Sequence, residues 1–168
     1  MATIRRFSNL TGFSVALIGQ WVAMDALRPA DLAAGMNRWE FDDGELEVGK
    51  LLRPLAVMAV PAEVLKLVSS ALRDVLDQAT SPTSIFSEAI AAAREGAPAW
   101  AVLQLAREPE NLRLELRINL MARPEVLAST IADWTMAAPP LPVIVLDLTD
   151  SLNARPRGAR WADQEGAA

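Results

Sequence analysis

The sequence predicts an α+β protein in which a mostly antiparallel sheet is packed by three or more helices within a single domain. Three observations support this fold class. An apolar stripe with helical spacing follows Pro61, apolar and polar residues alternate strictly through 112–120, and a continuous apolar run fills 143–148. A chain of 168 residues suits one domain, which we place at residues 1–150 ahead of a flexible tail at 151–168.

The segment 7–24 contains no charged residue and follows Arg5 and Arg6. Polar residues dilute it below the roughly 20 apolar residues that a membrane-spanning helix needs. As a signal-peptide cleavage site, Ala26 fits poorly because Met24 takes the place of a small residue. Apolar residues recur at three- and four-residue intervals: Leu10, Phe13, Leu17, Trp21 and Met24. We therefore expect a buried helix with no transmembrane segment, and an export signal stays an open alternative.

Two β elements are expected before the first clear helix. An Asp-Asp-Gly signal at 42–44 interrupts the alternation of residues 39–48, which indicates a hairpin turn. Residues 51–60 are rich in apolar side chains and predict a further strand. Pro54 would restrict that strand to an edge or a bulge, because proline has no N–H to donate to a sheet.

Pro61 begins the clearest helix, since proline is tolerated in a first helical turn. The predicted inner face consists of Val64, Leu65, Val68, Leu72, Val75 and Leu76. Lys66 follows Glu63 by three residues on the polar side, so we expect a weak surface pair. A second helix is expected between an N-cap at Ser81 and a stop at Gly96. Its predicted inner face is Ile85, Phe86, Ala89, Ile90 and Ala93.

The alternation in 111–121 predicts a strand with one buried and one solvated face, with Leu114, Leu116 and Ile118 pointing inward. The segment around 100–105 should pair with it as a hairpin. A helix is expected from Pro124, with Leu127, Ile131 and Trp134 on its inner face. The run 143–148 then predicts a strand covered on both faces, central in the sheet and able to pair parallel with 111–121.

Composition narrows the chemistry open to this chain. It has no Cys and no His, which excludes disulfides, thiolate ligands and the usual general base, and disfavours a zinc site. Its 16 basic and 21 acidic residues give a net charge of −5, which disfavours an extensive nucleic-acid contact. We expect no cofactor. No catalytic signature is present, so the sequence favours a protein without enzymatic activity.

Asp147 and Asp150 lie at the end of the 143–148 run, where α/β sheets often place ligands. Two carboxylates there suit Mg²⁺, which prefers oxygen ligands. A Mg-dependent enzyme acting on a phosphorylated substrate is therefore an alternative function. No phosphate-binding glycine loop accompanies the pair, so we expect both residues to be structural.

The favoured function is a cytoplasmic binding or adaptor protein that acts through protein contacts, with a homodimer as one form. Arg113 and Arg117 on the solvated strand face are candidate partner contacts. Trp161 stands alone beside Arg160 in the polar tail, and Trp and Arg often dominate binding energy. A third hypothesis is a carrier that encloses an apolar small ligand between helices and sheet, which the Met, Leu and Trp content permits.

Overall fold

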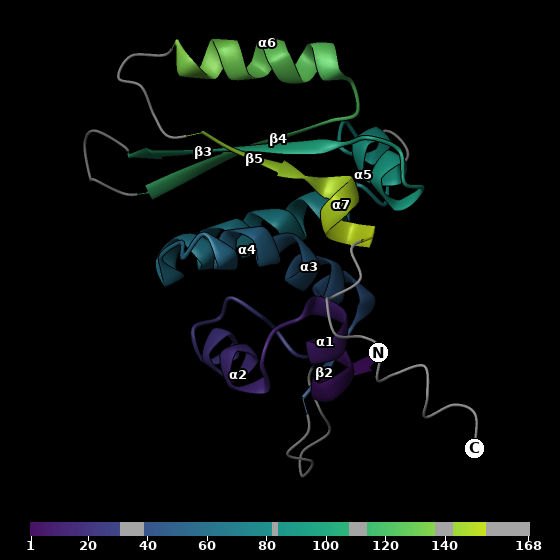
Figure 1. Cartoon of the computed structure of the whole chain (residues 1–168), viewed down its shortest axis with the longest axis vertical. Coiled ribbons are helices and arrows are strands. Elements are labelled where there is room, and N and C mark those ends of the chain that lie inside the picture. The colour runs from purple at the N-terminus through teal and green to yellow at the C-terminus, as the bar shows by residue number, and fades with distance from the viewer. Residues whose placement is uncertain (31–38, 82–83, 108–113, 137–142, 154–168) are drawn as a thin grey trace.

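A computed structural model describes residues 1–30, 39–81, 84–107, 114–136 and 143–153. Figure 1 shows the layers. Helix α6 (Pro124–Thr135) covers one face of a three-stranded sheet, and helices α3 (Asp43–Val57) and α4 (Ala62–Gln78) lie on the opposite side. Helices α1 (Ile4–Thr11) and α2 (Val15–Ala23) form a further layer beyond α3. The α+β class with helices packed on an antiparallel sheet is confirmed.

The uncharged N-terminal segment forms two helices instead of the one predicted. Gly12 ends α1 with a φ of 78°, a conformation that glycine adopts without strain, and its N–H donates to the carbonyl of Ser8 at 2.8 Å. Ser14 then caps the start of α2. Met24 is 36% exposed instead of buried. The segment is nevertheless a core element, because its buried side chains include Phe7, Phe13, Ile18 and Trp21.

Helix α3 replaces the hairpin that was predicted around the Asp-Asp-Gly signal, and that prediction is wrong. The Asp42 side chain accepts a hydrogen bond from the Glu45 N–H at 2.7 Å and so caps the helix. The strand before the helix is only two residues long: β2 (Glu40–Phe41) pairs antiparallel with β1 (Ala2–Thr3). The aspartate therefore begins a helix where it was expected to turn a hairpin.

The strand predicted for 51–60 is also wrong, because α3 continues through Pro54 to Val57. An internal proline costs a helix about 3 kcal/mol. Four fully buried side chains outweigh that cost at roughly 1.5–3 kcal/mol each: Val48, Leu51, Leu52 and Leu55. Gly49 brings α1 close, since a Cβ at this position would stand 2.5 Å from the Phe7 ring.

Helix α4 confirms the helix predicted after Pro61, and its six expected inner residues are all buried. Lys66 forms its ion pair with Asp25 at 3.4 Å, so the pairing expected with Glu63 is corrected. The next helix, α5, spans Ser87–Arg94 and begins later than the expected N-cap at Ser81. Its inner residues Ala89, Ile90 and Ala93 are buried as predicted, whereas Ile85 precedes the helix and is 80% exposed.

The predicted hairpin is confirmed. Strand β3 (Trp100–Arg107) pairs antiparallel with β4 (Leu114–Met121), with Leu103 opposite Ile118 and Leu105 opposite Leu116. Leu103 is fully buried, and its partners on this face are partly buried against the helical core. Residues 111–113 of the predicted strand and the side chain of Leu114 lie outside the described part of the chain.

Strand β5 (Val143–Asp147) is not central in the sheet, which corrects the sequence prediction. The strand order is β4-β3-β5, so β3 is the middle strand and β5 is an edge strand antiparallel to it. Val145 is 41% exposed instead of covered. The pairing with β3 is antiparallel, so the parallel pairing expected with β4 is also corrected. Helix α7 (Leu148–Asn153) follows directly and places Leu152 in the core.

The second face of the sheet is covered in part by α6, although a solvated face was predicted there. Val102 and Gln104 of β3 are both buried on that face, and the Gln104 side chain donates to the carbonyl of Trp134 at 3.1 Å. Trp134 itself, like Leu127 and Ile131, is half-buried. Arg117 on the same face remains exposed. The sheet is therefore enclosed between two helical layers near β3 (Figure 1).

Candidate functional site

A cleft of about 280 Å³ opens where the start of α3 meets α4 and the segment after α2. Its lining includes five charged residues: Arg28, Asp42, Glu45, Arg73 and Asp77. Small-molecule pockets are usually somewhat larger and mostly apolar. Half of the ten lining residues of this cleft are charged, and the hypothesis of an apolar-ligand carrier stays a prediction.

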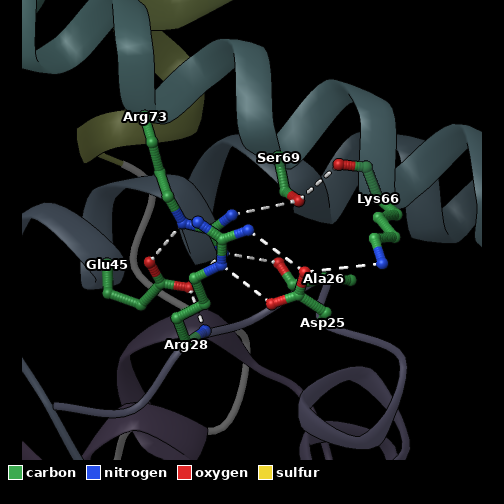
Figure 2. A network of polar contacts seen from close by, with 7 residues as sticks. All are labelled: Asp25, Ala26, Arg28, Glu45, Lys66, Ser69 and Arg73. Atoms are coloured by element: carbon green, nitrogen blue, oxygen red, sulfur yellow. Dashed lines mark hydrogen bonds and ion pairs between the residues drawn. The ribbon is translucent and has the colours of Figure 1, made fainter. Parts of the chain in front are cut away.

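Glu45 and Arg73, which both line the cleft, form a largely buried ion pair (Figure 2). Arg73 Nη2 lies 2.7 Å from Glu45 Oε1, and Arg73 Nε lies 2.8 Å from Oε2. The two side chains are only 15% and 5% exposed. Two parallel N–H donors on one carboxylate are the strongest common form of protein ion pair. This pair joins α3 to α4.

Further hydrogen bonds tie the same pair to the segment that follows α2. The Arg28 N–H donates to Glu45 Oε1 at 2.6 Å, and Arg73 Nη2 donates to the carbonyl of Ala26 at 2.9 Å. Arg73 Nη1 also reaches Ser69 Oγ at 3.5 Å (Figure 2). Both carboxylate oxygens therefore accept from N–H donors within the chain. The network stabilises three segments against one another.

A second, more exposed group borders the buried pair. The Arg28 guanidinium donates to both carboxylate oxygens of Asp25, at 2.8 and 3.1 Å, and Lys66 approaches from α4. The hydrogen bond from Arg28 lowers the pKa of Asp25 from 3.8 to about 2, and the charge of Lys66 adds to this. The same hydrogen bond raises the pKa of Arg28. Asp25 has a φ of 61°, which aspartate tolerates better than most residues.

Sequence reasoning did not identify the Glu45–Arg73 pair. A partial signal was present, because an acidic cap followed three residues later by Glu is a helix-start pattern, as in Asp42 and Glu45. In that pattern the glutamate usually turns back to the cap residue. Here it turns toward Arg73, which only the packing of α3 on α4 brings near.

The carboxylates of the metal alternative lie at the start of α7. Asp147 Oδ1 accepts from the Asp150 N–H at 2.8 Å, in the manner of a helix N-cap, and both side chains are exposed. In the described part of the chain, no cluster of three or more acidic, His or Cys residues is placed to hold a metal ion. The geometry gives Asp147 a capping role, and a metal there stays an untested alternative.

Of the four candidate partner contacts, the structure describes Arg117. Arg117 lies exposed on β4, an edge strand of the sheet. Arg113, Arg160 and Trp161 lie outside the described residues, so their expected roles stay predictions.

One exposed surface of helix α2 carries no charged residue. Its outward residues, together called the α2 outer face, are Val15, Ala16, Gly19, Gln20, Ala23 and the adjoining Met24. Val15 is 48% exposed and Met24 is 36% exposed. The ring of Trp39, itself 37% exposed, lies 3.5 Å from the position that a Cβ on Gly19 would occupy. No residue of α2 is charged.

None of the described helices is long and apolar enough to cross a membrane. Comparison with models of known protein families finds no match to this chain, and comparison with curated proteins finds none either.

Proposed function

We propose that this chain is a non-enzymatic binding or adaptor protein that holds a protein partner against the α2 outer face. The observation that carries the proposal is the exposure of this uncharged surface on a helix whose other side is already buried through Ile18 and Trp21. Most of the residues of α2 are apolar, with Gln20 as its polar exception, and apolar helix surface is normally buried. A partner that covers the outward side would complete that burial.

The composition of the surface fits the centre of a protein interface. Interface cores are depleted in charged residues and enriched in aromatic residues and methionine. The α2 outer face combines Met24 with the neighbouring Trp39, and an anchoring Trp often dominates binding energy. Charged groups follow at one end, where Asp25 and Arg28 form their ion pair. This arrangement favours a partner with an apolar centre and polar margins.

The test compares two pairs of lysine substitutions at exposed helical alanines. Ala16→Lys with Ala23→Lys places two charges on the α2 outer face, and Ala91→Lys with Ala132→Lys places two charges on α5 and α6. Tagged full-length protein is recovered from an extract of the native cells, and any bound protein is identified and purified for direct binding. The proposal expects one protein to bind the wild type and the α5/α6 variant but to bind the α2 variant at least tenfold more weakly, a loss of about 1.4 kcal/mol.

Two results would overturn the proposal. One is equal binding of the identified partner by both double variants. The other is binding of the α2 outer face to phosphatidylcholine or phosphatidylglycerol vesicles, abolished by the α2 substitutions, with no direct protein partner. Circular dichroism on each variant separates lost binding from lost folding. The cytoplasmic location and a contribution of Arg117 to the contact stay predictions.

A further inference from the structure

The outer edge of β5 has backbone groups that no described strand pairs with. The Leu148 N–H donates to the carbonyl of Ala99 at 2.9 Å, so the backbone groups of Leu148 point toward the chain segment of β3. Because the direction alternates along a strand, the N–H and C=O groups of Val143 and Val145 point away from β3. We call these groups the β5 outer edge. Such an edge is a template for another strand.

The sequence of β5 fits a second copy of itself. In an antiparallel pairing centred on Val145, each Val145 faces its counterpart, Ile144 faces Leu146, and Val143 faces Asp147. The facing pair at Val145 uses the outward backbone groups and can exchange two hydrogen bonds. At the neighbouring pair, Asp147 can offer its N–H to Val143, since its carbonyl already accepts from Ser151 Oγ. In this register the two Asp147 residues are separated by four residue steps of ~3.3 Å, or about 13 Å. This distance exceeds the Debye length of physiological salt, which is about 8 Å. No like charges meet in this register.

Side-chain exposure favours this edge over the opposite one. Val145 is 41% exposed on a short, apolar strand, and a facing copy would cover it. The opposite edge strand, β4, carries the exposed Arg117. Charged residues on an edge strand are a common obstacle to strand pairing. The exposed charge of β5, Asp147, stands at the end of its strand, so β5 is the more favourable of the two edges for pairing.

We propose that two copies of this chain pair through the β5 outer edge in a symmetric dimer with a continuous antiparallel sheet. A two-fold axis passing by Val145 generates such a contact, in which the same surface serves both subunits. The dimer would carry two α2 outer faces, and bivalent display strengthens binding to a partner with repeated sites. The dimer does not depend on the partner proposed for α2.

The test uses the position that faces itself. The molar mass of the full-length protein is measured by sedimentation over micromolar to submillimolar concentrations, and we expect it to rise from 18.2 kDa toward twice that value. Val145→Lys places two like charges face to face and should raise the dissociation constant about tenfold or more. Val145→Glu should do the same. Mixing these two variants should restore the dimer, because Lys then faces Glu. Val145→Thr keeps the branched shape without charge and should dimerise.

Three outcomes would overturn the proposal: a constant monomer mass over the whole range, a dimer that Val145→Lys leaves unchanged, or variants that fail to associate when mixed although circular dichroism shows both folded. The Ala16→Lys, Ala23→Lys variant should dimerise normally. Loss of the α2 partner and loss of the dimer are thus separate results.

Discussion

Replacing Arg73 with Ala should destabilise the protein far more than replacing Arg94 with Ala, although both arginines make the same kind of contact. Each donates through Nε and Nη2 to the two oxygens of a glutamate on α3: Arg73 to Glu45 at 2.8 and 2.7 Å, and Arg94 to Glu47 at 2.9 and 2.7 Å. The Glu45–Arg73 pair is more deeply buried, and Arg73 also donates to the carbonyl of Ala26 at 2.9 Å. Arg94→Ala is the control for loss of the two-donor contact alone.

The expected magnitudes follow from exposure. The Arg73 and Glu45 side chains are 15% and 5% exposed, so Arg73→Ala leaves a carboxylate buried without its counter-charge. Breaking a buried pair in this way costs about 3–5 kcal/mol. The Arg94 and Glu47 side chains are 47% and 22% exposed, and water solvates what remains. The loss of such a surface pair costs about 0.2–1 kcal/mol.

Urea unfolding followed by circular dichroism measures both free energies of unfolding under the same conditions. The double variant Glu45→Leu, Arg73→Met should recover part of the loss, because it leaves no unpaired buried charge. Similar costs for Arg73→Ala and Arg94→Ala, or a double variant less stable than Arg73→Ala, would refute the view that a buried charge pair ties α3 to α4.

Four further predictions concern other parts of the chain. Because the pKa of Asp25 is lowered to about 2, its charge stabilises the folded state above about pH 4, and this contribution is lost as the pH falls toward 2. The stability difference between wild type and Asp25→Asn should therefore shrink over that range in acid unfolding experiments, and a constant difference would contradict it. Leu103→Ala should lower the free energy of unfolding by roughly 2–5 kcal/mol, because this side chain is buried. Arg117→Ala should change it by no more than about 0.5 kcal/mol. Urea titrations measure both values, and the reverse order would show that the sheet faces are misassigned. Asp147→Asn keeps an oxygen that can cap α7, so it should change stability little while Asp147→Ala costs about 0.5–2 kcal/mol. Mg²⁺ should not raise the melting temperature, and a saturable rise abolished by Asp147→Asn with Asp150→Asn would instead favour the metal-dependent alternative.

The elements that the sequence predicted well each carry one unambiguous pattern. In α4 the apolar stripe has a single period of helical spacing and a proline in front, so pattern and start signal agree. In the β3–β4 hairpin, the sequence of β4 alternates between apolar and polar residues from Leu114 to Leu120. Helix α3 was missed because its first residues also alternate and Pro54 argued against a helix. Burial against α1 and α4, which no local window contains, decided that segment.

The position of β5 and the Glu45–Arg73 pair depend on contacts between distant residues. A continuous apolar run predicts burial on both faces, yet β5 lies at an edge because β3 pairs with both of the other strands. Glu45 and Arg73 are 28 residues apart in the chain, and neither spacing nor composition relates them. The α2 outer face was not predicted from the sequence, for another reason. The absence of charge along 7–24 indicated burial, but it did not distinguish burial within the chain from burial against a partner.

Photo-crosslinking from the α2 outer face tests the proposed function most directly. A photoreactive amino acid is placed at position 16 on α2, and in a control protein at position 91 on α5; both positions hold exposed alanines. After irradiation in native cells, we expect position 16 to crosslink to a defined protein that also binds the purified chain, and position 91 to give no such product. If both positions gave the same products, or if position 16 crosslinked only to lipid, the α2 outer face would not be a protein-binding surface.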